Sequence, residues 1–510
     1  MISSIDPEKC TGCGTCFKSC PLDVFRLDTE QREISPCTHA CPAGTDIRAC
    51  HYLLQQGRSE DALDVLKRTM PLPAVTGRVC FHPCESACTR KDVDEALNIN
   101  ALEQFLGDLD LRLPAPIFPR RHLSRVAVVG SGPAGLATAW YLAEAGYPVT
   151  VFESMPEPGG MLRYGIPNYR LPRERLQWDI DAILSTGVEA KCNFDISSPE
   201  GMAEIRNHFD ATYISIGSHN AKPIGIPGEY AKGVIPAVEM LRGIGDDAMP
   251  DFNGKVVVVI GGGNVAMDVA RTAKRLGATE VSIVYRRRKD DMTALPDEIG
   301  GAIAEGCTLV QLKAPSKIAT NKRGEVQALW VKPQIAGQAD KSGRPRPVDS
   351  SEPEEKIPCD IIISAIGQAT DIRFFEEFGI PVFRGNIQAK KNSVVDNVLG
   401  TYAGGDCVTG PSTVINAVAA GKVAAANIDA YLGFNHEITV DVDIPTPIPN
   451  DHLPCGRVEL KERFAKQRGN DFDEVEQGMS LEEAMQEASR CLRCDYHGFG
   501  SFRGGRDTKW

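Results

Sequence analysis

The sequence of 510 residues lacks three features that would each assign it to a broad class of proteins. No apolar run approaches the roughly 18 residues of a membrane-spanning helix, so we expect no membrane span. The N-terminus has no basic region followed by an apolar core, which argues against a secretory signal. Lysine and arginine form no long runs and the net charge is −12, which provides no basic field for nucleic acid. We therefore expect a cytoplasmic globular protein of roughly three or four domains.

Cysteine, in contrast, is abundant and unevenly distributed. Of the 17 cysteines, ten lie in the first 88 residues, mostly separated by two or three residues. In a small secreted protein this spacing would indicate disulfides, but here a long chain without a signal peptide follows. A reducing cytosol and metal ligation are therefore the better explanation.

The first cysteine group has the spacing of a bacterial ferredoxin. It consists of Cys10, Cys13, Cys16 and Cys20, followed by Pro21, in the pattern C-x2-C-x2-C-x3-C-P. Thiolates at this spacing bind a 4Fe-4S cluster, whereas structural zinc sites usually use two separated pairs. In two-cluster ferredoxins the fourth cysteine of such a run serves the other cluster, and this sequence has one such run. Either Cys20 or a distant thiol such as Cys50 completes the site, and we favour Cys20.

A second cysteine group lies within helical sequence. Residues 46–66 are expected to form two short helices, with Ser59 as the N-cap of the second. The cysteines of this group are Cys37, Cys41, Cys80, Cys84 and Cys88. At the far end of the chain an acidic helix runs into Cys491 and Cys494, which brings the total to seven, one ligand short of two clusters. Glu103 can supply the missing ligand as a carboxylate.

The next part of the chain has the pattern of a dinucleotide-binding fold. The pattern comprises an apolar strand at 126–129, the glycines Gly130, Gly132 and Gly135, a helix at 136–145 and a second strand at 149–152. The first glycine permits a tight turn, the second a close approach to a pyrophosphate, and the third close packing of the helix. Glu153 ends the second strand, where a carboxylate accepts hydrogen bonds from a ribose.

The same pattern recurs later with a different ending. It comprises a strand at 255–260, the residues Gly261, Gly263 and Ala266, a helix ending near Gly277 and a strand at 281–285. The second strand is followed by Arg286, Arg287 and Arg288 instead of an acid. An acid there would favour a free ribose 2′-hydroxyl, whereas arginines suit a 2′-phosphate. We therefore expect NADPH rather than NADH, the alternative being a solvated basic turn.

Four longer stretches resemble a known family. They are T-G-R-V-C-F-H-P-C-E-S-A-C at 76–88, G-G-M-L-R-Y-G-I-P-N-Y-R-L-P at 159–172, V-Y-R-R-R-K-D-D-M-T-A at 284–294 and A-G-G-D-C-V-T-G-P at 403–411. In these stretches the sequence is similar to the small (β) subunit of glutamate synthase and to the N-terminal half of dihydropyrimidine dehydrogenase. It also resembles the large subunit of bifurcating NADH-dependent ferredoxin:NADP oxidoreductase. The resemblance covers nearly everything from residue 36 to residue 495.

This resemblance implies two 4Fe-4S clusters in an all-helical domain. One would be held by Cys37, Cys88, Cys491 and Cys494, and the other by Cys41, Cys80, Cys84 and Glu103, with Gln104 as the alternative to Glu103. In the family the leading C-x2-C pair commonly lies just before the position of Cys37. Here a ferredoxin run occupies that end and the pair lies at the C-terminus. The alternative is that Cys491 and Cys494 serve a partner or no cluster.

The resemblance also implies the residues around the two nucleotides. Those expected near FAD, besides the three glycines, are Pro133, Ala134, Glu153, Gly160, Met161, Leu162, Arg163, Gly367, Gly405, Asp406 and Thr413. Those expected near NADP or NAD, besides Gly261, Gly263 and Ala266, are Asn264, Val265, Arg286 and Arg287. A helix at 416–425 would direct its N-terminus at the flavin and stabilise negative charge on the reduced ring. The isolated cysteines Cys192, Cys307, Cys359, Cys407 and Cys455 are expected to be structural.

We predict an α/β fold with two Rossmann-like dinucleotide-binding domains of the pyridine nucleotide-disulfide oxidoreductase type. A helical iron–sulfur domain and a small ferredoxin-like segment precede them. The expected domains are the ferredoxin-like segment 1–34, the helical double-cluster domain 35–120, the FAD-binding parts 121–220 and 369–435, the NAD(P)H-binding domain 221–368, and a tail 436–510 that returns Cys491 and Cys494 to the helical domain.

Together these features predict an FAD-dependent NAD(P)H oxidoreductase with three 4Fe-4S clusters. Nicotinamide exchanges two electrons as hydride and clusters exchange one at a time, so the flavin is expected to connect them. The predicted route runs from NAD(P)H through FAD, the Glu-ligated cluster, the all-cysteine cluster and the N-terminal cluster to a partner, or in reverse. The flavoprotein core contains no C-x2-C or C-x4-C pair, which argues against a disulfide reductase.

The sequence shows no second catalytic pocket. It has no pattern of an FMN-binding barrel, a glutaminase nucleophile or a molybdopterin site, and we name no catalytic side chain. We therefore expect a hetero-oligomer in which the partner is a catalytic or electron-accepting subunit, such as that of glutamate synthase. The alternative is a self-sufficient NAD(P)H:ferredoxin oxidoreductase, which bifurcates electrons if a second flavoprotein joins it.

Overall fold

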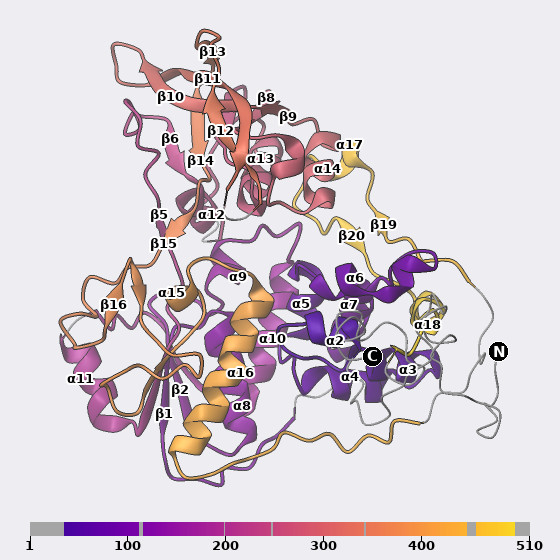
Figure 1. The fold of residues 1–510 in the computed structure, drawn as a ribbon. Helices are drawn as coiled ribbons and strands as arrows, with labels where there is room; N and C mark the ends of the chain where they lie inside the picture. The colour runs from indigo at the N-terminus through magenta and orange to yellow at the C-terminus, as the bar shows by residue number, and fades with distance from the viewer. Residues whose placement is uncertain are drawn as a thin grey trace, which may run out of the picture. The chain divides into compact units, whose positions relative to one another are not determined.

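The computed structural model describes residues 35–111, 116–197, 199–245, 248–340, 343–445 and 455–494, and the chain forms two compact units (Figure 1). The helical unit contains Met1–Arg112, Thr439–Leu460 and Gly478–Trp510, and the sheet unit contains Leu113–Ile438 and Lys461–Gln477. The ferredoxin-like cysteines, Cys10, Cys13, Cys16 and Cys20, lie outside the described residues. Within the described ranges, no helix is long and apolar enough to cross a membrane.

The helical unit contains short helices joined by tight turns. They are α2 (Pro36–Ala40), α3 (Ile47–Gln55), α4 (Ser59–Lys67), α5 (Pro73–Val79), α6 (Pro83–Ala87), the 3-10 helix η1 (Thr89–Asp92), α7 (Ile99–Asp110) and α18 (Leu481–Ser489). Glycines allow α5 and α7 to touch backbone to backbone. A Cβ on Gly77 would lie 2.4 Å from the Cα of Gln104, and a Cβ on Gly107 would lie 2.6 Å from the Cα of Ala74. This crossing holds Glu103 and Gln104 against the end of α5, where Cys80 follows.

The two helices expected within residues 46–66 are present, but the expected cap of the second is wrong. Ser59 is the first residue of α4, and Arg58 occupies the N-cap position without a side-chain cap bond. Instead, Arg58 Nε donates to Asp61 Oδ2 at 2.5 Å, which stabilises the first turn with an ion pair. The Ser59 hydroxyl is buried without a hydrogen-bond partner.

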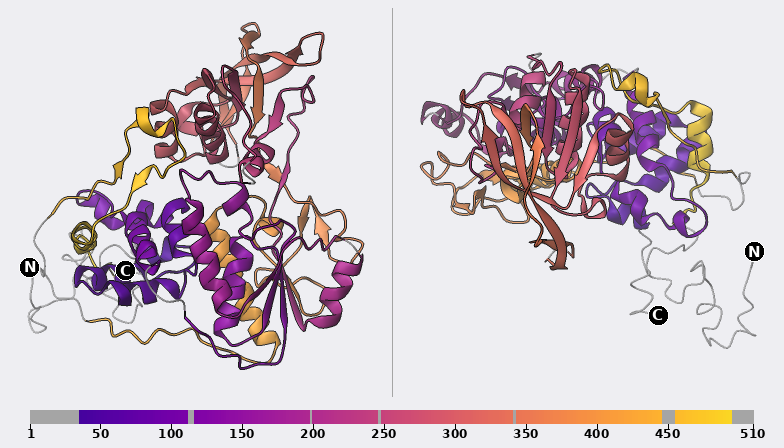
Figure 2. Two further views of the ribbon diagram at one scale, coloured as in Figure 1. Left: turned by 180° about the vertical axis from the view of Figure 1, so that it is seen from behind. Right: turned by 90° about the horizontal axis from the view of Figure 1, so that it is seen from above.

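The first domain of the sheet unit is a parallel five-stranded sheet with the strand order β18-β4-β1-β2-β3. Its strands are β1 (Val126–Val129), β2 (Val149–Phe152), β3 (Glu189–Lys191), β4 (Ala211–Ile214) and β18 (Thr401–Ala403). Helices α8 (Pro133–Glu144), α10 (Arg173–Ser185) and α16 (Val414–Tyr431) lie on one side and α11 (Pro199–His208) on the other (Figure 2). Helix α8 begins three residues before the expected start because Pro133 suits the first helical position.

The second domain repeats this architecture with the strand order β6-β14-β7-β8-β9. Its elements are β6 (Val234–Pro236), α12 (Ala237–Gly245), β7 (Val256–Ile260), α13 (Asn264–Arg275), β8 (Glu280–Tyr285), α14 (Pro296–Ala304), β9 (Thr308–Gln311) and β14 (Ile361–Ser364). An antiparallel sheet of β10 (Lys313–Thr320), β11 (Val326–Ala339), β12 (Pro345–Asp349) and β13 (Glu355–Pro358) extends from it. Where the chain crosses between the domains, β5 (Asn220–Ala221) pairs with β15 (Gln368–Ala369).

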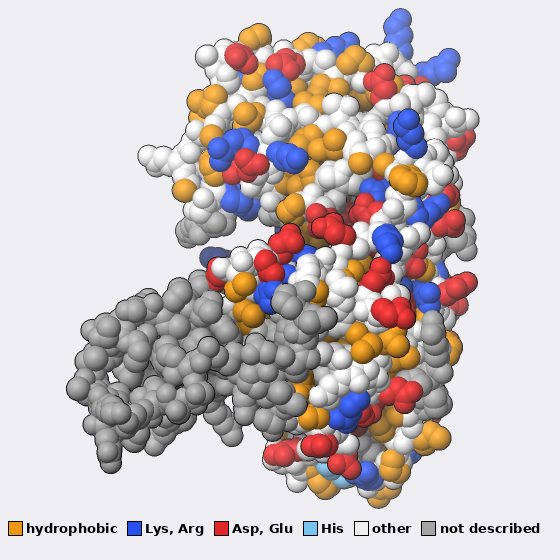
Figure 3. Space-filling view, turned by 90° about the vertical axis from the view of Figure 1, so that its right-hand side faces the viewer, with side chains coloured by type: hydrophobic (Ala, Val, Ile, Leu, Met, Phe, Trp, Pro, Cys, Tyr) orange, Lys and Arg blue, Asp and Glu red, His pale blue; other side chains and the backbone are white. Residues whose placement is uncertain are grey.

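Three smaller elements complete the sheet unit around the nucleotide loops. They are α9 (Met161–Tyr164), α15 (Asp406–Thr409) and the antiparallel pair β16 (Val382–Phe383) and β17 (Asn386–Ile387). On the face drawn in Figure 3, acidic and basic side chains are interspersed over the described surface, in agreement with the absence of charge runs in the sequence.

Residues Lys461–Gln477 form a C-terminal strap that returns to the sheet unit. The strap contains β19 (Lys461–Glu462), α17 (Ala465–Arg468) and β20 (Glu476–Gln477). Its backbone bonds to the loop after α9, because Val475 N–H donates to Tyr169 O at 3.0 Å and Asn168 donates to Phe472 O at 3.0 Å. Arg275 of α13 donates to Asp471 O at 2.8 Å, so the strap contacts both domains.

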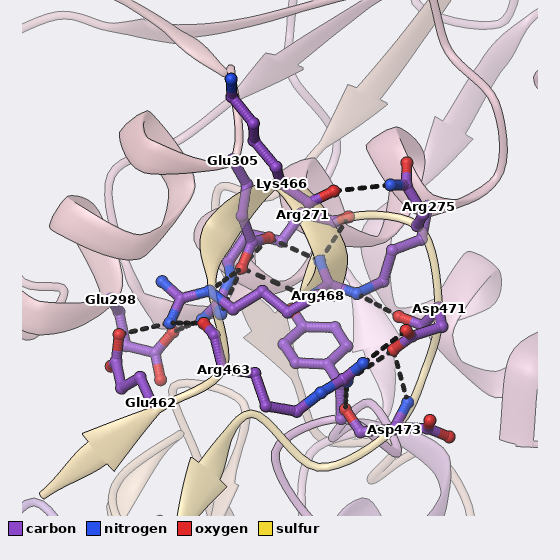
Figure 4. A network of polar contacts seen from close by, with 12 residues as sticks. Arg271, Arg275, Glu298, Glu305, Glu462, Arg463, Lys466, Arg468, Asp471 and Asp473 are labelled. Carbon is purple, nitrogen blue, oxygen red and sulfur yellow. Dashed lines mark hydrogen bonds and ion pairs between the residues drawn. The ribbon is translucent and has the colours of Figure 1, made fainter.

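A fully buried carboxylate, Glu305, joins the strap to α13 (Figure 4). It accepts hydrogen bonds from Arg271 at 2.8 Å, Arg275 at 2.5 Å and Arg468 of the strap at 3.1 Å. Tyr169 covers the arginines, with the Arg275 guanidinium 3.8 Å from its ring centre. Burial by itself raises the pKa of Glu305, but the hydrogen bonds from Arg271 and Arg275 and their charges hold the pKa below its usual value.

Replacing Glu305 by glutamine is expected to lower the free energy of unfolding of the sheet unit by about 3–5 kcal/mol, because the buried Arg275 loses its counter-charge and Arg271 and Arg468 each lose one of two carboxylate partners. The folded-state pKa is depressed, so the contribution of the carboxylate is present above the ordinary pKa of about 4.3 and is lost as the pH falls through the folded pKa. The variant should therefore lose less stability than the wild type on acidification below that value. Urea unfolding at several pH values measures both effects.

The matched control is Glu204→Gln. Glu204 pairs with Lys191 at 3.3 Å and both side chains are nearly half exposed, so the change should cost less than about 1 kcal/mol. Equal destabilisation by the two substitutions would contradict the role assigned to the buried network.

Candidate functional site

The glycine-rich turn after β1 has the geometry of a pyrophosphate cradle. Gly130 has φ +98°, and a Cβ there would lie 2.5 Å from Ser215 O. A Cβ on Gly135 would lie 1.9 Å from Gly130 O, so the helix packs directly on the turn. Gly132, in contrast, has no atom within 4 Å of its Cβ position and leaves open space at the N-terminus of α8. Backbone N–H groups at a helix N-terminus bind phosphate, and this space suits the pyrophosphate of FAD.

Two further predicted flavin motifs converge on the same turn. A Cβ on Gly160 would lie 2.8 Å from the Cα of Gly132, and a Cβ on Gly405 would lie 3.1 Å from the Cβ of Ala134. Helix α16 also packs tightly on α8, because a Cβ on Gly421 would lie 2.4 Å from Ala134 O. The structure thus brings together three segments that are more than 200 residues apart at their extremes.

Glu153, predicted to bind a ribose, is buried and contacts the glycine turn. Its carboxylate accepts hydrogen bonds from Ser131 N–H at 2.9 Å, from Ser131 Oγ at 2.5 Å and from Met155 N–H at 2.8 Å. Sequence reasoning missed Ser131, although a hydroxyl between the first two glycines is a visible signal. Glu153 therefore orients the glycine turn through Ser131, and its contact with a ribose stays a prediction.

Asp406 and Thr413 lie where α15 and α16 begin. Gly405 has φ +73° and directs the chain into α15, and Asp406 Oδ1 accepts from Ser412 N–H at 3.1 Å. Burial raises the pKa of Asp406 to about 6, and the Ser412 hydrogen bond opposes this rise. Thr413 caps α16 by accepting from Asn416 N–H at 3.4 Å. The predicted helix at 416–425 is the central part of α16.

The residues of α9 divide into buried and surface-directed side chains. Leu162 is buried, and the thioether of Met161 lies over Gly165. Arg163 donates to Pro158 O at 2.8 Å and to Gln177, so its guanidinium is bound by the preceding loop and by α10. Gly367, with φ +120°, makes the turn into β15 and accepts from Lys222 N–H at 3.2 Å.

The second glycine turn follows β7 and resembles the first. Gly261 has φ +150°, and a Cβ there would lie 2.4 Å from Ala365 O and 3.2 Å from the Ala266 Cβ. Gly263 is the N-cap of α13, and Asn264 Oδ1 accepts from Leu295 N–H at 2.9 Å. Val265 packs against the core of this domain. The Tyr285 ring covers Gly262, where a Cβ would lie 2.4 Å from a ring carbon.

The three arginines after β8 have different partners. Arg286 is exposed and makes no ion pair within the described part of the chain. Arg287 is buried and donates to Asp340 Oδ2 at 2.7 Å, while its Nε and Nη1 have no partner. Arg288 donates to both carboxylate oxygens of Asp291, at 3.0 and 3.1 Å. Arg286 is therefore the arginine that is available to an anion at the end of this strand.

Four cysteines of the helical unit line one pocket. They are Cys37 on α2, Cys88 at the end of α6, and Cys491 and Cys494 after α18. Two hydroxyls lie beside the thiols, since the Ser35 Oγ is 3.2 Å from the Cys37 Sγ and the Thr89 Oγ1 is 3.0 Å from the Cys494 Sγ. The C-terminal pair thus meets the N-terminal cysteines across about 400 residues of sequence.

Glu487 and Arg490 hold the C-terminal pair in place. The Glu487 carboxylate is fully buried and accepts from Asn98 N–H at 2.8 Å and from Val458 N–H at 2.7 Å. It also accepts from Arg490 at 2.6 Å. Arg490 in turn donates to Asp94 and to the backbone before α7, which fixes the residue directly preceding Cys491.

The other predicted ligand set is also gathered in the helical unit. Cys41, Cys80, Cys84 and Glu103 are all buried. Burial raises the pKa of the Cys80 and Cys84 thiols, and the nearby Glu103 carboxylate adds to both shifts. Burial likewise raises the pKa of Glu103 to about 8. Both polar side-chain atoms of Gln104 are buried and have no hydrogen-bond partner among the described residues, so Gln104 stays the alternative ligand.

The ligands of a 4Fe-4S cube each bind a different iron, so they lie farther apart than the ligands of a single metal ion. The four pocket cysteines are the ligand type of such a cube. The thiols must lose their protons to the metal for this purpose.

The remaining cysteines have other surroundings. Cys50 is buried on α3, and burial raises its pKa, with the charges of Asp46, Glu103 and Cys37 adding to this effect. Its role for the N-terminal run is untested because that run lies outside the described residues. Cys407 is fully buried with its Sγ 3.2 Å from Gly404 O, as expected for a packed residue.

Comparison with known families agrees with this arrangement. Residues 124–421 match the pyridine nucleotide-disulphide oxidoreductase family. Residues 31–113 match the 4Fe-4S cluster domain II of dihydropyrimidine dehydrogenase, and residues 4–26 match the 4Fe-4S binding domain.

The chain is also similar to characterised proteins along most of its length. It is 38% identical to the NADP(+)-dependent formate dehydrogenase subunit beta of Moorella thermoacetica, over 90% of this chain and 70% of the relative. It is 35% identical to the NADPH-Fe(3+) oxidoreductase subunit beta of Geobacter sulfurreducens, over 93% and 77%. It is 31% identical to the glutamate synthase [NADPH] small chain of Escherichia coli, over 78% and 88%. The fold of Mycobacterium tuberculosis FprA in complex with NADPH is similar, with a TM-score of 0.52, 21% identity and coverage of 61% of this chain and 85% of that chain.

Fold and site together define an electron-transfer flavoprotein, an FAD-dependent NAD(P)H oxidoreductase that also carries 4Fe-4S clusters. The chain belongs to the pyridine nucleotide-disulphide oxidoreductase family. The predicted fold class, the family resemblance and the kinds of cofactor are confirmed, and the number of clusters stays a prediction.

Changing Glu487 to glutamine is expected to loosen the C-terminal pair. The substitution leaves the buried Arg490 with the partly exposed Asp94 in place of two counter-charges and directs an amide N–H at a backbone donor, which costs about 3–5 kcal/mol. Hydrogen–deuterium exchange should accelerate in residues 481–494. Glu482→Gln is the control, because Glu482 is exposed and contacts only Ser480. Unchanged exchange in the Glu487 variant would show that other contacts hold this segment.

Proposed function

We propose that this chain is the NADPH-oxidising or NADP-reducing subunit of a larger oxidoreductase complex. The observation that carries the proposal is the pocket of four cysteines from both ends of a chain that also contains two dinucleotide turns. Such a chain can connect a two-electron carrier to one-electron carriers. The sequence contains no further catalytic pattern, so substrate chemistry belongs to a partner.

The proposed ligands form three sets. Cys37, Cys88, Cys491 and Cys494 hold one cluster; Cys41, Cys80, Cys84 and Glu103 hold the second; Cys10, Cys13, Cys16 and Cys20 hold the third. The second set and Cys88 are buried, whereas Cys37, Cys491 and Cys494 are partly buried, and solvent exposure is one determinant of cluster potential. A carboxylate in the second set is expected to give that cluster a potential different from that of an all-thiolate cluster.

The residues around the nucleotides bind and orient them. FAD supplies the chemistry that links hydride transfer to single-electron transfer. The open space at Gly132 receives the pyrophosphate, Glu153 orients the turn, and the N-terminus of α16 faces the flavin as a stabilising positive dipole end. The turn of Gly261 and Gly263 would receive the pyrophosphate of the nicotinamide dinucleotide, and Arg286, beside the buried Arg287, would bind its 2′-phosphate.

The partner is proposed to be a catalytic or electron-accepting subunit. The relatives from Moorella and Geobacter are named as beta subunits, and the one from Escherichia coli as a small chain, which supports assembly into a hetero-oligomer. A cytoplasmic location is proposed because every described cysteine is a free thiol, as a reducing compartment maintains.

An anaerobic titration of the full chain with NADPH, and separately with NADH, tests the function. We expect NADPH to bleach the flavin and cluster EPR signals to appear in the same sample. In Cys491→Ser one of these signals should disappear, whereas Cys455→Ser should retain all of them, because Cys455 lies outside the pocket. Flavin bleaching without any cluster signal would overturn the proposed electron path.

Replacing Arg286 by alanine tests the nucleotide preference. Loss of a charge-assisted hydrogen bond costs about 1.5–3 kcal/mol, so the KM for NADPH should rise roughly 10- to 100-fold with little change for NADH. Arg288→Ala is the matched control, because Asp291 already binds that guanidinium. An equal rise of the KM for NADPH and for NADH would show that Arg286 does not bind the 2′-phosphate.

A further inference from the structure

The pocket of Cys37, Cys88, Cys491 and Cys494 contains one polar side chain that no other residue satisfies. Besides the cysteines, the polar side chains that line it are Ser35, Arg48, His51, Thr89 and Arg90. Four of the five have partners. His51 lies on α3, is 3% exposed, and its Nδ1 is buried without a hydrogen-bond partner within the described residues.

The partners of the other four are within the helical unit. Ser35 bonds to Cys37 and Thr38, and Thr89 bonds to Cys494. Arg48 donates to Asp46, and Arg90 donates to Asp94 and to Arg490 O. Buried polar groups in native proteins are almost always hydrogen-bonded, so the free ring nitrogen of His51 indicates an acceptor that occupies the pocket.

We propose that His51 donates a hydrogen bond from its ring N–H to a sulfur of the cluster held by these four cysteines, and thereby raises the reduction potential of that cluster. The inference rests on the ligand set proposed above. Imidazole carries at least one N–H in both of its protonation states, so the donor is present at any pH.

The direction of the effect follows from charge. Reduction adds one negative charge, part of which resides on the sulfurs, and a hydrogen-bond donor stabilises the more negative state. Hydrogen bonds to sulfur are one of the recognised determinants of cluster potential. His51 would thus make the pocket cluster a better electron acceptor from the cluster that includes Glu103.

The test compares the full-length wild type with His51→Leu and His51→Gln. The EPR signal that disappears in Cys491→Ser identifies the pocket cluster, and its midpoint potential is measured by redox titration in each protein. His51→Leu should shift this midpoint to more negative values and leave the other clusters unchanged. His51→Gln, which keeps an N–H donor, should restore part of the shift. Pulsed EPR should show a weakly coupled exchangeable proton in the wild type that is lost in His51→Leu.

Leu54→Met is the matched control for altered packing of α3, because Leu54 is fully buried on the same helix and does not line the pocket. An unchanged midpoint in His51→Leu with the cluster intact overturns the inference and leaves the proposed function standing. Loss of the cluster in both His51 variants, or a nitrogen coupling as strong as that of iron-bound imidazole, overturns it because His51 would then be a ligand. If Cys491→Ser removes no signal, the proposed ligand set fails and the inference fails with it.

Discussion

One buried ion pair, Glu487 with Arg490, supports the arrangement of the four pocket thiols that we propose as cluster ligands. The carboxylate accepts two backbone N–H groups that belong to segments about 360 residues apart, and the guanidinium extends to the loop before α7. A buried carboxylate that accepts hydrogen bonds from three partners is stable only where all of them are in place. The same interaction that seats α18 therefore fixes Cys491 beside Cys37, and the pocket exists only in the folded helical unit.

The nucleotide turns depend on a different constraint, the close approach of backbones. Gly135 and Gly261 lie against carbonyl oxygens at distances that no Cβ permits, so strand, turn and helix adopt a single arrangement. Gly132 is different because its Cβ position is open, and this opening is what a pyrophosphate can use. The convergence of Gly160 and Gly405 on the same turn explains how motifs far apart in sequence contribute to one flavin site.

In the sheet unit, a buried charged network attaches the C-terminal strap to α13. Glu305 with three arginines ties the strap Lys461–Gln477 to α13, while the strap backbone bonds to the loop after α9. Along the chain the strap is followed directly by α18 and then by Cys491 and Cys494. The strap is bound within the sheet unit, and α18 is bound within the helical unit. Such anchoring limits the conformational freedom of the segment that carries the two thiols.

The sequence alone determined the elements whose signals are local. The apolar runs at β1, β2, β7 and β8, the glycine spacings and the acidic helix before Cys491 were all predictable, because strand length, backbone freedom at glycine and helix periodicity act over a few residues. Tertiary structure decided which thiols share a pocket, because Thr89 and Cys494 meet across 405 residues of sequence. It also decided that Arg288 is bound by Asp291 and Arg287 by Asp340 while Arg286 stays exposed, and that Ser131 joins Glu153. These outcomes depend on burial and on partners brought together by packing, and no local pattern in the chain encodes them.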